Sequence, residues 1–125
     1  MQVTVVRATS YIYDATLVRV IDGDTAIFDL AVAFDPGFHI MLDVTARQRI
    51  RFARVNCPEH GTPEGDAATA FTKQWLAAAD HGVTVETHGE DDYGRWLGEI
   101  RNYATGDSLN QALLDSGHAV PWPAK

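Results

Sequence analysis

"VIDGDTAIF", residues 20–28, is the stretch that decides the fold. An apolar run ends in Asp22-Gly23, a strong turn signal, and a second apolar run follows it. The pattern predicts two neighbouring strands, over residues 15–21 and 25–34. Asp24 places a second negative charge at the rim of this apolar region. We interpret Asp22 as a turn residue, whereas a second carboxylate at this position needs a chemical explanation.

Four more strands and two helices are predicted after this pair. "DPG" at 35–37 predicts a turn with proline at its second position. Runs rich in β-branched and aromatic residues predict strands over residues 38–44, 49–55, 83–87 and 96–103.

The periodicity changes to that of a helix in two places. Aromatic residues and alanines recur at helical spacing over residues 66–80, and Gly82 stands where a C-terminal cap would lie. Ser108 and Gln111 form a capping box that predicts a second, short helix ended by Gly117. Short strands with a helix among them fit a small Greek-key barrel better than a sandwich. We therefore predict a mainly β (α+β) fold: a five-stranded Greek-key barrel of the oligonucleotide-binding (OB) type with two or three helices.

Length and composition indicate one globular domain spanning residues 1–125. The apolar fraction is 46% and the charged fraction 22%, which are ordinary values for a globular protein. One cysteine, Cys57, cannot form an internal disulfide. No stretch has the pattern of a signal peptide or the length of a membrane span. We expect a soluble, cytoplasmic monomer that does not enter a membrane.

The charge distribution gives conflicting indications about nucleic acid. The formal net charge is −7, whereas proteins that hold nucleic acid loosely carry a surplus of Lys and Arg. Yet Arg47, Arg49, Arg51 and Arg54 fall within eight residues, and the first three alternate. On a strand, alternate side chains share a face, so these three would form a basic stripe. The stripe is either a binding surface or an ordinary solvated strand face.

Most common catalytic and metal motifs are missing from the sequence. No nucleotide-binding glycine loop, nucleophile elbow, zinc motif or EF-hand spacing occurs. What remains are acidic, amide and arginine side chains near strand ends: Asp24, Arg51, Asn56, Glu59 and Arg95. Carboxylate, amide and backbone oxygens from adjacent strand ends are suitable ligands for a hard cation such as Ca²⁺. Taken singly, "DGD" is more often just a turn.

Five segments in order resemble the staphylococcal nuclease (thermonuclease-like) family: "VIDGDT", "RIRFARVNCPE", "AFTK", "DDYGRW" and "SLNQALLDSGHA". The resemblance runs from about residue 15 to residue 120. It implies an OB-type barrel that carries a Ca²⁺-dependent phosphodiesterase, with Mg²⁺ or Mn²⁺ as alternative cations. Such an enzyme cuts DNA and RNA with little sequence preference and typically leaves 3′-phosphates.

The resemblance also implies roles for single residues. It makes Asp24 a metal ligand that is exposed for this purpose, Arg51 and Arg95 phosphate clamps, and Glu59 the catalytic carboxylate. Two guanidiniums and a cation are suited to stabilise the negative charge of a five-coordinate phosphorus. The glutamate would orient or deprotonate the attacking water. The family's second metal aspartate corresponds to Asn56, and its backbone-carbonyl ligand corresponds to Cys57.

Substrate contacts are expected from Tyr93, Arg49 and Trp122. Tyr93 matches the tyrosine that lies beside the nucleotide in the family, where its ring would stack on a base or its hydroxyl touch phosphate. Its alternative role is packing at the barrel rim. Trp122 is the nearby aromatic that would replace the family's missing C-terminal tyrosines, or it belongs to the core.

Several departures weaken the expected grip on metal and substrate. Asn56 removes one charge from the metal site, and Asp92 would repel a terminal phosphate. The stretch between Asp24 and Arg51 is long, which predicts an extended β-hairpin around residues 35–37. The acidic surface adds to these effects. The alternative to an active nuclease is therefore a nuclease-like domain without catalysis that binds nucleic acid or a protein partner.

Overall fold

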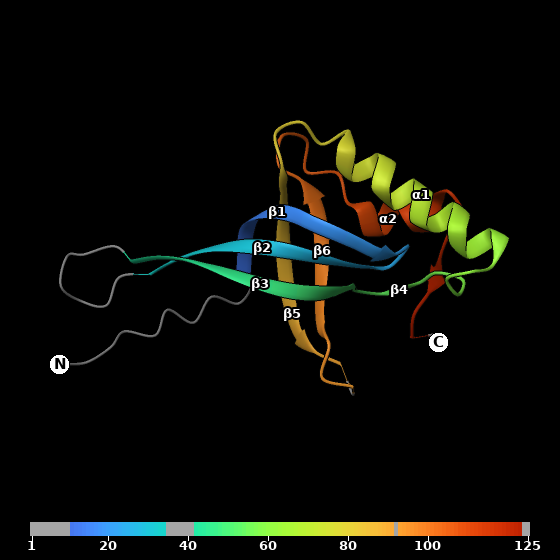
Figure 1. Cartoon of the computed structure of the whole chain (residues 1–125), viewed down its shortest axis with the longest axis horizontal. Coiled ribbons are helices and arrows are strands. Elements are labelled where there is room, and N and C mark those ends of the chain that lie inside the picture. The colour runs from blue at the N-terminus through green and yellow to red at the C-terminus, as the bar shows by residue number, and fades with distance from the viewer. Residues whose placement is uncertain (1–10, 35–41, 92, 124–125) are drawn as a thin grey trace.

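Five strands form a closed barrel in the order β1–β2–β3–β6–β5 in the computed structural model, which describes residues 11–34, 42–91 and 93–123 (Figure 1). Two short strands form a separate sheet, and two helices lie together beside one end of the barrel (Figure 1). The mainly β prediction is confirmed. The elements are β1 (Tyr11–Asp22), β2 (Thr25–Phe34), β3 (Leu42–Phe52), β4 (Val55–Asn56), α1 (Pro63–Ala77), β5 (Val83–Glu90), β6 (Trp96–Asn102), α2 (Leu109–Asp115) and β7 (Val120–Pro121).

The barrel closes through β1 on one side. Ala15 of β1 pairs with Leu30 of β2 and also with Val83 of β5. The first residues of β1 therefore run along β5, and the remainder run along β2. This second pairing explains why β1 begins at Tyr11 rather than at residue 15, because the partner strand is not visible in the local sequence pattern.

A short parallel ladder closes the barrel on the other side. Ile50, Arg51 and Phe52 of β3 pair with residues 96–98 of β6, and the N–H of Ala53 donates to the carbonyl of Gly98 at 2.8 Å. A Cβ at Gly98 would lie 2.7 Å from Cγ2 of Ile50, so the strands approach too closely for a side chain there. The end of β3 is thereby held beside the beginning of β6.

The predicted extended hairpin is confirmed. Strands β2 and β3 pair from Thr25–Arg51 out to Phe34–Leu42 and run past the rest of the barrel (Figure 1). The prediction of two separate strands over 38–44 and 49–55 is wrong, because β3 is continuous from Leu42 to Phe52. The residues in the middle of β3 are polar because most of them are exposed on the hairpin. Polar side chains on an exposed face do not interrupt a strand. Three predicted features lie outside the described residues: the turn at 35–37, the start of the strand predicted over 38–44, and Asp92.

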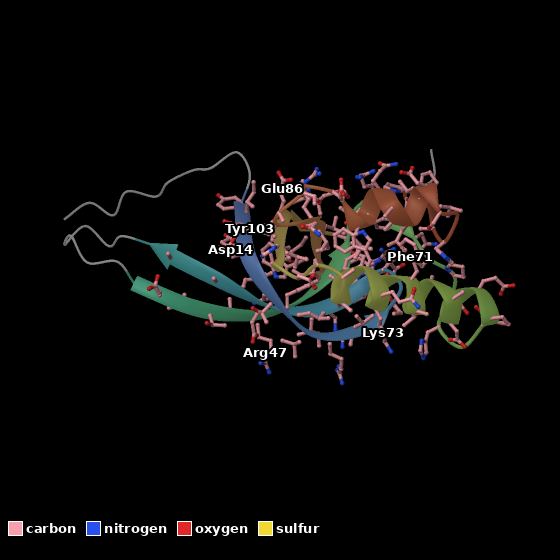
Figure 2. All side chains as sticks on the ribbon, turned by 90° about the horizontal axis from the view of Figure 1, so that it is seen from above. Asp14, Arg47, Phe71, Lys73, Glu86 and Tyr103 are labelled. Atoms are coloured by element: carbon pink, nitrogen blue, oxygen red, sulfur yellow. The ribbon has the colours of Figure 1, made fainter. Side chains whose placement is uncertain are left out.

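The core fills the barrel and continues beneath the two helices. Phe28, Ile50 and Phe52 are fully buried inside the barrel. On α2, Leu109 and Leu113 are fully buried. Apolar burial of this kind contributes about 25 cal/mol per Å² and is the main driving force for folding. In Figure 2, Phe71 lies where α1 faces α2, and its ring packs 4.8 Å from that of His118.

Helix α1 begins earlier than predicted. Thr62 is its N-cap and accepts a hydrogen bond from the N–H of Gly65 at 3.0 Å, and Pro63 opens the first turn. Proline suits this position because its missing N–H would be unpaired there in any case. The helix ends at Ala77 with Ala78 as its C-cap, so Gly82 is not the cap that the sequence predicted. Gly82 instead has φ +86° in the turn that leads to β5. Within the described residues, neither helix is long and apolar enough to cross a membrane.

Helix α2 is joined to the barrel by a buried asparagine. The capping prediction is confirmed, since Ser108 accepts from the N–H of Gln111 at 3.0 Å. The fully buried Asn110 donates to the carbonyls of Ala53 and Gly98 and accepts from the N–H of Ile100. All three bonds reach the seam between β3 and β6.

An ion pair reinforces the same seam. Arg54, which has φ +61°, donates from Nε and Nη2 to the two oxygens of Glu99 at 3.0 and 2.7 Å. Ser108 also donates to this buried carboxylate. Burial alone would raise the pKa of Glu99, but the hydrogen bonds from Arg54 and Ser108 outweigh it and hold the pKa below its ordinary value.

We expect Gly65→Ala to destabilise the protein, although alanine ordinarily stabilises a helix relative to glycine by about 1 kcal/mol. A Cβ at residue 65 would lie 1.9 Å from the carbonyl oxygen of Glu59, so the helix or that carbonyl must move. The free energy of unfolding, measured with urea, should fall by about 1–3 kcal/mol. Gln74→Ala, at an exposed position of α1, is the control and should stay within about 0.5 kcal/mol of wild type. An unchanged or increased stability of Gly65→Ala would contradict this packing.

We expect Glu99→Gln to lower the free energy of unfolding at pH 7 by about 1–3 kcal/mol, because a buried charge-assisted pair is lost. The folded-state pKa lies below the ordinary value of 4.5, so the ionised carboxylate adds stability that is complete above pH 4.5. That stability is lost as the pH falls through the folded-state pKa. The difference between the variant and wild type should therefore shrink on acidification.

Asp29→Asn is the matched control, because it breaks the exposed pair of Asp29 with Arg47. Exposed pairs contribute little, so its effect should be clearly smaller than that of Glu99→Gln. Equal losses in the two variants would show that the Arg54–Glu99 pair does not stabilise the seam.

Candidate active site

A cleft of about 380 Å³ lies where the β1–β2 turn meets the end of β3, the start of β6 and the C-terminal segment. Residues from five separate parts of the chain line it, so the fold and not the local sequence assembles it. Eight of the nine site residues predicted from the sequence are among them, and Arg49 is not. The lining residues are Asp22, Asp24, Thr25, Arg51, Asn56, Cys57, Pro58, Glu59, His60, Tyr93, Arg95 and Trp122.

Asp24 lies at the inner wall of the cleft. The expectation that it is exposed is wrong, since only 8% of the residue is accessible. Its Oδ2 accepts from the N–H of Cys57 at 2.9 Å, and its Oδ1 accepts from the hydroxyl of Thr25 at 3.2 Å. The turn role of Asp22 is confirmed, because Asp22 Oδ1 accepts from the N–H of Asp24 at 3.1 Å.

The carboxylate of Asp24 is held in an unfavourable environment for its charge. Burial raises its pKa to about 6, and the neighbouring Asp22 carboxyl adds to the rise. The Cys57 N–H and the Arg51 guanidinium offset this only in part. A buried carboxylate with incomplete compensation is suited to receive a cation.

Arg51 is fixed by acceptors on one side and by an aromatic ring on the other. Only 4% of the residue is exposed. Nη1 donates to the carbonyls of Phe52 and Val55 at 3.0 and 2.8 Å and lies 3.4 Å from Oδ2 of Asp24. The guanidinium carbon lies 5.2 Å from the ring centroid of Trp122. Trp122 therefore contacts a site residue. Its backbone N–H donates to the carbonyl of Arg54, which holds this C-terminal segment beside the cleft.

Asn56 and Cys57 lie beside these two residues. Asn56 Oδ1 accepts from Nη2 of Arg51 at 3.1 Å. Burial first, and then the Asp24 charge, raise the pKa of the Cys57 thiol to about 12, so the side chain stays protonated. Among the described residues, no group of three or more His, Cys, Asp and Glu side chains could hold a metal on its own. The available donors are a carboxylate, an amide oxygen and backbone carbonyls, a set that fits a hard cation completing its coordination with water.

Arg95 lies across the cleft in a different setting. Its Nε donates to Oδ2 of Asp91 at 2.7 Å, and its backbone N–H donates to Oδ1 at 2.9 Å. The guanidinium carbon lies 5.2 Å from the centroid of the Tyr93 ring. Burial would raise the pKa of Asp91, but hydrogen bonds from Arg95 and Tyr93 lower it overall. Tyr93 itself is 80% exposed, so the alternative role of packing at the barrel rim is wrong, and its role as a substrate contact stays a prediction.

Glu59 is an exposed residue in the lining of the cleft, just before α1. Its backbone carbonyl accepts from the hydroxyl of Thr62, the N-cap of the helix, at 2.7 Å. Within the described residues, no hydrogen bond or ion pair engages its carboxylate. The backbone of Glu59 is therefore fixed by the helix start, and its carboxylate is available to a water molecule.

The predicted basic stripe does not form a continuous surface. Arg47, labelled in Figure 2 on the outer side of the sheet, is paired with Asp29 at 2.8 Å. Arg51 is buried in the cleft. Arg49 is exposed opposite Ile27 and outside the cleft, and its role as a substrate contact stays a prediction.

Sequence reasoning missed one residue of the site in particular. Asp91 received no role, although it stands four positions before Arg95 in the quoted "DDYGRW". The signal that could have found it is an acidic residue just ahead of a tight turn, placed to accept from the following N–H groups. Thr25 and His60 also line the cleft without having been predicted.

Size alone does not identify the site. A larger hollow of about 470 Å³ lies where β1 leaves β2 for β5, and Asp14 and Tyr103, labelled in Figure 2, are part of it. Its described lining holds two aspartates and a histidine but no lysine or arginine, so it is poorly suited to phosphate. Its lining residues are Asp14, Ala15, Thr16, Asp29, Ala31, Thr45, His81, Gly82, Val83 and Tyr103.

Comparison with known proteins agrees with this geometry. Residues 49–123, more than half of the chain, match the family described as staphylococcal nuclease homologue. Comparison with the curated proteins gives no match. The matched span contains Arg51, Glu59 and Arg95, and the barrel adds Asp24 through the pairing of Thr25 with Arg51. The chain belongs to the family of staphylococcal nuclease homologues.

Proposed function

We propose that this protein is a cation-dependent phosphodiesterase that cuts DNA or RNA with little sequence preference and leaves 3′-phosphates. The observation that carries the proposal is the meeting of Asp24, Arg51, Glu59 and Arg95 in one cleft. These side chains supply the two requirements of phosphodiester hydrolysis. Positive charge is needed at the phosphate oxygens, and a base or orienting group is needed for the water.

The two arginines would hold the reacting phosphate. Phosphate oxygens gain negative charge as the phosphorus becomes five-coordinate, and guanidinium donors fixed in advance stabilise that charge without reorganising. Arg51 is rigid, since its donors Nη1 and Nη2 already bond to protein acceptors. Its Nε and the remaining hydrogen of Nη2 are left to meet a phosphate oxygen. Arg95, 41% exposed at its side chain, would reach the phosphate from the other wall.

Glu59 would act on the attacking water. Its carboxylate is exposed and free of partners among the described residues, which suits a group that must bind and orient a water molecule. The available geometry supports either deprotonation or orientation of that water. Both roles require the carboxylate to be ionised.

The donor set supports Ca²⁺ as the cation, with Mg²⁺ and Mn²⁺ as alternatives. Asp24 would be the charged ligand, with the Asn56 amide oxygen and the Cys57 carbonyl as neutral ones. When bound, a divalent cation would supply further positive charge to the phosphate oxygens. The raised pKa of Asp24 supports this assignment, because a cation would relieve the cost of burying its charge.

Tyr93 supports a nucleotide substrate. A ring that is 80% exposed at the mouth of a phosphate site offers a stacking surface to any base. Stacking does not distinguish sequences, which agrees with low specificity. We expect a weak grip on long chains, because the net charge of −7 opposes a polyanion.

The test is cleavage of plasmid DNA and of RNA in Ca²⁺, Mg²⁺, Mn²⁺ or EDTA. We expect cleavage with at least one cation and none with EDTA. Glu59→Ala, Arg51→Ala and Arg95→Ala should each lower kcat by about 10²–10³-fold. Glu59→Ala should have little effect on folding, whereas Arg51→Ala should also lower the free energy of unfolding, because two buried carbonyls and an amide oxygen lose their donor. Arg101→Ala is the control, because Arg101 is an exposed arginine outside the cleft. Mass spectrometry of the products should show 3′-phosphates.

Two outcomes of this assay would count against the proposal. If no cation supports cleavage, the enzyme proposal fails, and fluorescence anisotropy with labelled oligonucleotides then tests the alternative of a binding domain. Wild-type turnover in Arg51→Ala or Arg95→Ala would remove that residue from the site.

A separate prediction concerns the neutral ligand at residue 56. Asn56→Asp adds a charged oxygen ligand, so it should tighten Ca²⁺ binding by about tenfold in isothermal titration calorimetry. Asn102→Asp adds the same charge at the far end of β6 and should leave the affinity close to wild type. Unchanged or weaker affinity in Asn56→Asp would place this side chain outside the coordination shell.

A further inference from the structure

One buried carboxylate organises the wall of the cleft that carries Arg95. The side chain of Asp91 is 3% exposed. Its Oδ1 accepts from the backbone N–H groups of Tyr93 and Arg95, both at 2.9 Å. Its Oδ2 receives Nε and Nη2 of Arg95 at 2.7 and 2.6 Å. The same carboxylate therefore fixes both the turn and the guanidinium that the turn carries.

These contacts decide which part of Arg95 can meet a ligand. Asp91 occupies the edge of the guanidinium formed by Nε and Nη2. The ring of Tyr93 lies 5.2 Å from the guanidinium carbon. The side chain nevertheless remains 41% exposed and lines the cleft. Nη1 and the outer hydrogen of Nη2 are the donors left for a phosphate oxygen.

The two arginines of the cleft are held by different kinds of partner. Arg51 donates to two backbone carbonyls and an amide oxygen, and its nearest carboxylate, Asp24, is 3.4 Å away. Arg95 is paired directly with a carboxylate. The negative charge of Asp91, at 2.6 and 2.7 Å from Arg95, weakens the attraction of Arg95 for a phosphate before reaction. The same pairing fixes the direction of the free donors of Arg95.

We infer that Asp91 is a positioning residue for phosphodiester cleavage, which acts through Arg95 by presenting one edge of its guanidinium to the reacting phosphate. This inference rests on the proposed function. Positioning of this kind favours the transition state over substrate binding, so its loss should lower kcat more than it raises KM.

Asp91→Asn separates the two roles of the carboxylate. An asparagine oxygen can still accept from the two backbone N–H groups, as Asn102 does from those of Ala104 and Thr105. The amide has no charge for Arg95 and presents a donor to it. We expect a loss in kcat of about 10- to 100-fold and an unchanged or lower KM. The melting temperature should fall, as for Glu99→Gln, because a buried carboxylate loses its charged pair with an arginine, so kcat and KM are measured well below it. Asp80→Asn, at an exposed position after α1, is the control.

A double variant tests whether Asp91 acts through Arg95. In the Arg95→Ala background, Asp91→Asn should cause no further loss in kcat, because its target is already gone. Additive losses would overturn the inference, and so would wild-type kcat in Asp91→Asn. A raised KM in Asp91→Asn with kcat close to wild type would show a structural role only, and would also overturn it.

An NMR measurement separates this inference from the proposed function. The Nε–H signal of Arg95, assigned by its loss in Arg95→Lys, should shift and exchange faster with water in Asp91→Asn. A signal that does not respond overturns the inference whether or not the protein is a nuclease. If the signal responds but wild type cleaves no nucleic acid with any cation, the pairing stands and the proposed function fails, and the catalytic role of Asp91 fails with it.

Discussion

Three residues of parallel pairing between β3 and β6 hold the cleft together. Parallel strands need a long crossover, and here α1 and β5 provide it, so Arg51 and Arg95 lie far apart in sequence. The pairing of Arg51 with Leu97 places the start of β6, and hence Arg95, beside the end of β3. A ladder this short is weak alone. The buried Asn110 and the Arg54–Glu99 pair reinforce it from outside the cleft, so stability and site geometry depend on the same seam.

The cleft itself is a place where the fold accepts an unfavourable environment. A buried carboxylate costs free energy unless partners compensate it, and the pKa of Asp24, raised to about 6, shows that its partners do so incompletely. Arg51 is also buried, but it donates three hydrogen bonds, to two carbonyls and an amide oxygen. The imbalance therefore rests on the acid and not on the arginine. Such local conflict is expected where a ligand, and not the folded chain, completes the electrostatics.

Local chemistry explains which parts of the structure could be predicted. Strand β2 and the cap at Ser108 follow from alternation and capping, which act within a few residues. The start of β1 depends on β5, a partner far along the chain, and local pattern cannot show it. Eight of the residues predicted from the resemblance meet in one cleft. The resemblance could identify them because it depends on the order of short motifs and not on the distances between them along the chain. The burial of Asp24 depends on packing from other elements, so the local pattern could not show it. The pairing of Asp91 spans only four residues, and its signal is the acidic residue that stands just ahead of a tight turn.

The pairing of the arginines decides how an acidic protein would bind the phosphate of the proposed function. Arg47, Arg54 and Arg95 are each paired with a carboxylate, so they contribute little to the field far from the surface. Arg51 also lies 3.4 Å from the carboxylate of Asp24, and three acidic residues, Asp22, Asp24 and Glu59, face the two arginines in the lining of the cleft. With a net charge of −7, long-range attraction of a polyanion is weak, and under the proposed function recognition would come from short-range contacts once a phosphate has entered. Under the proposed function, the cleft would therefore select a single phosphate that fits between its two arginines, and would not attract a polyanion along its whole length.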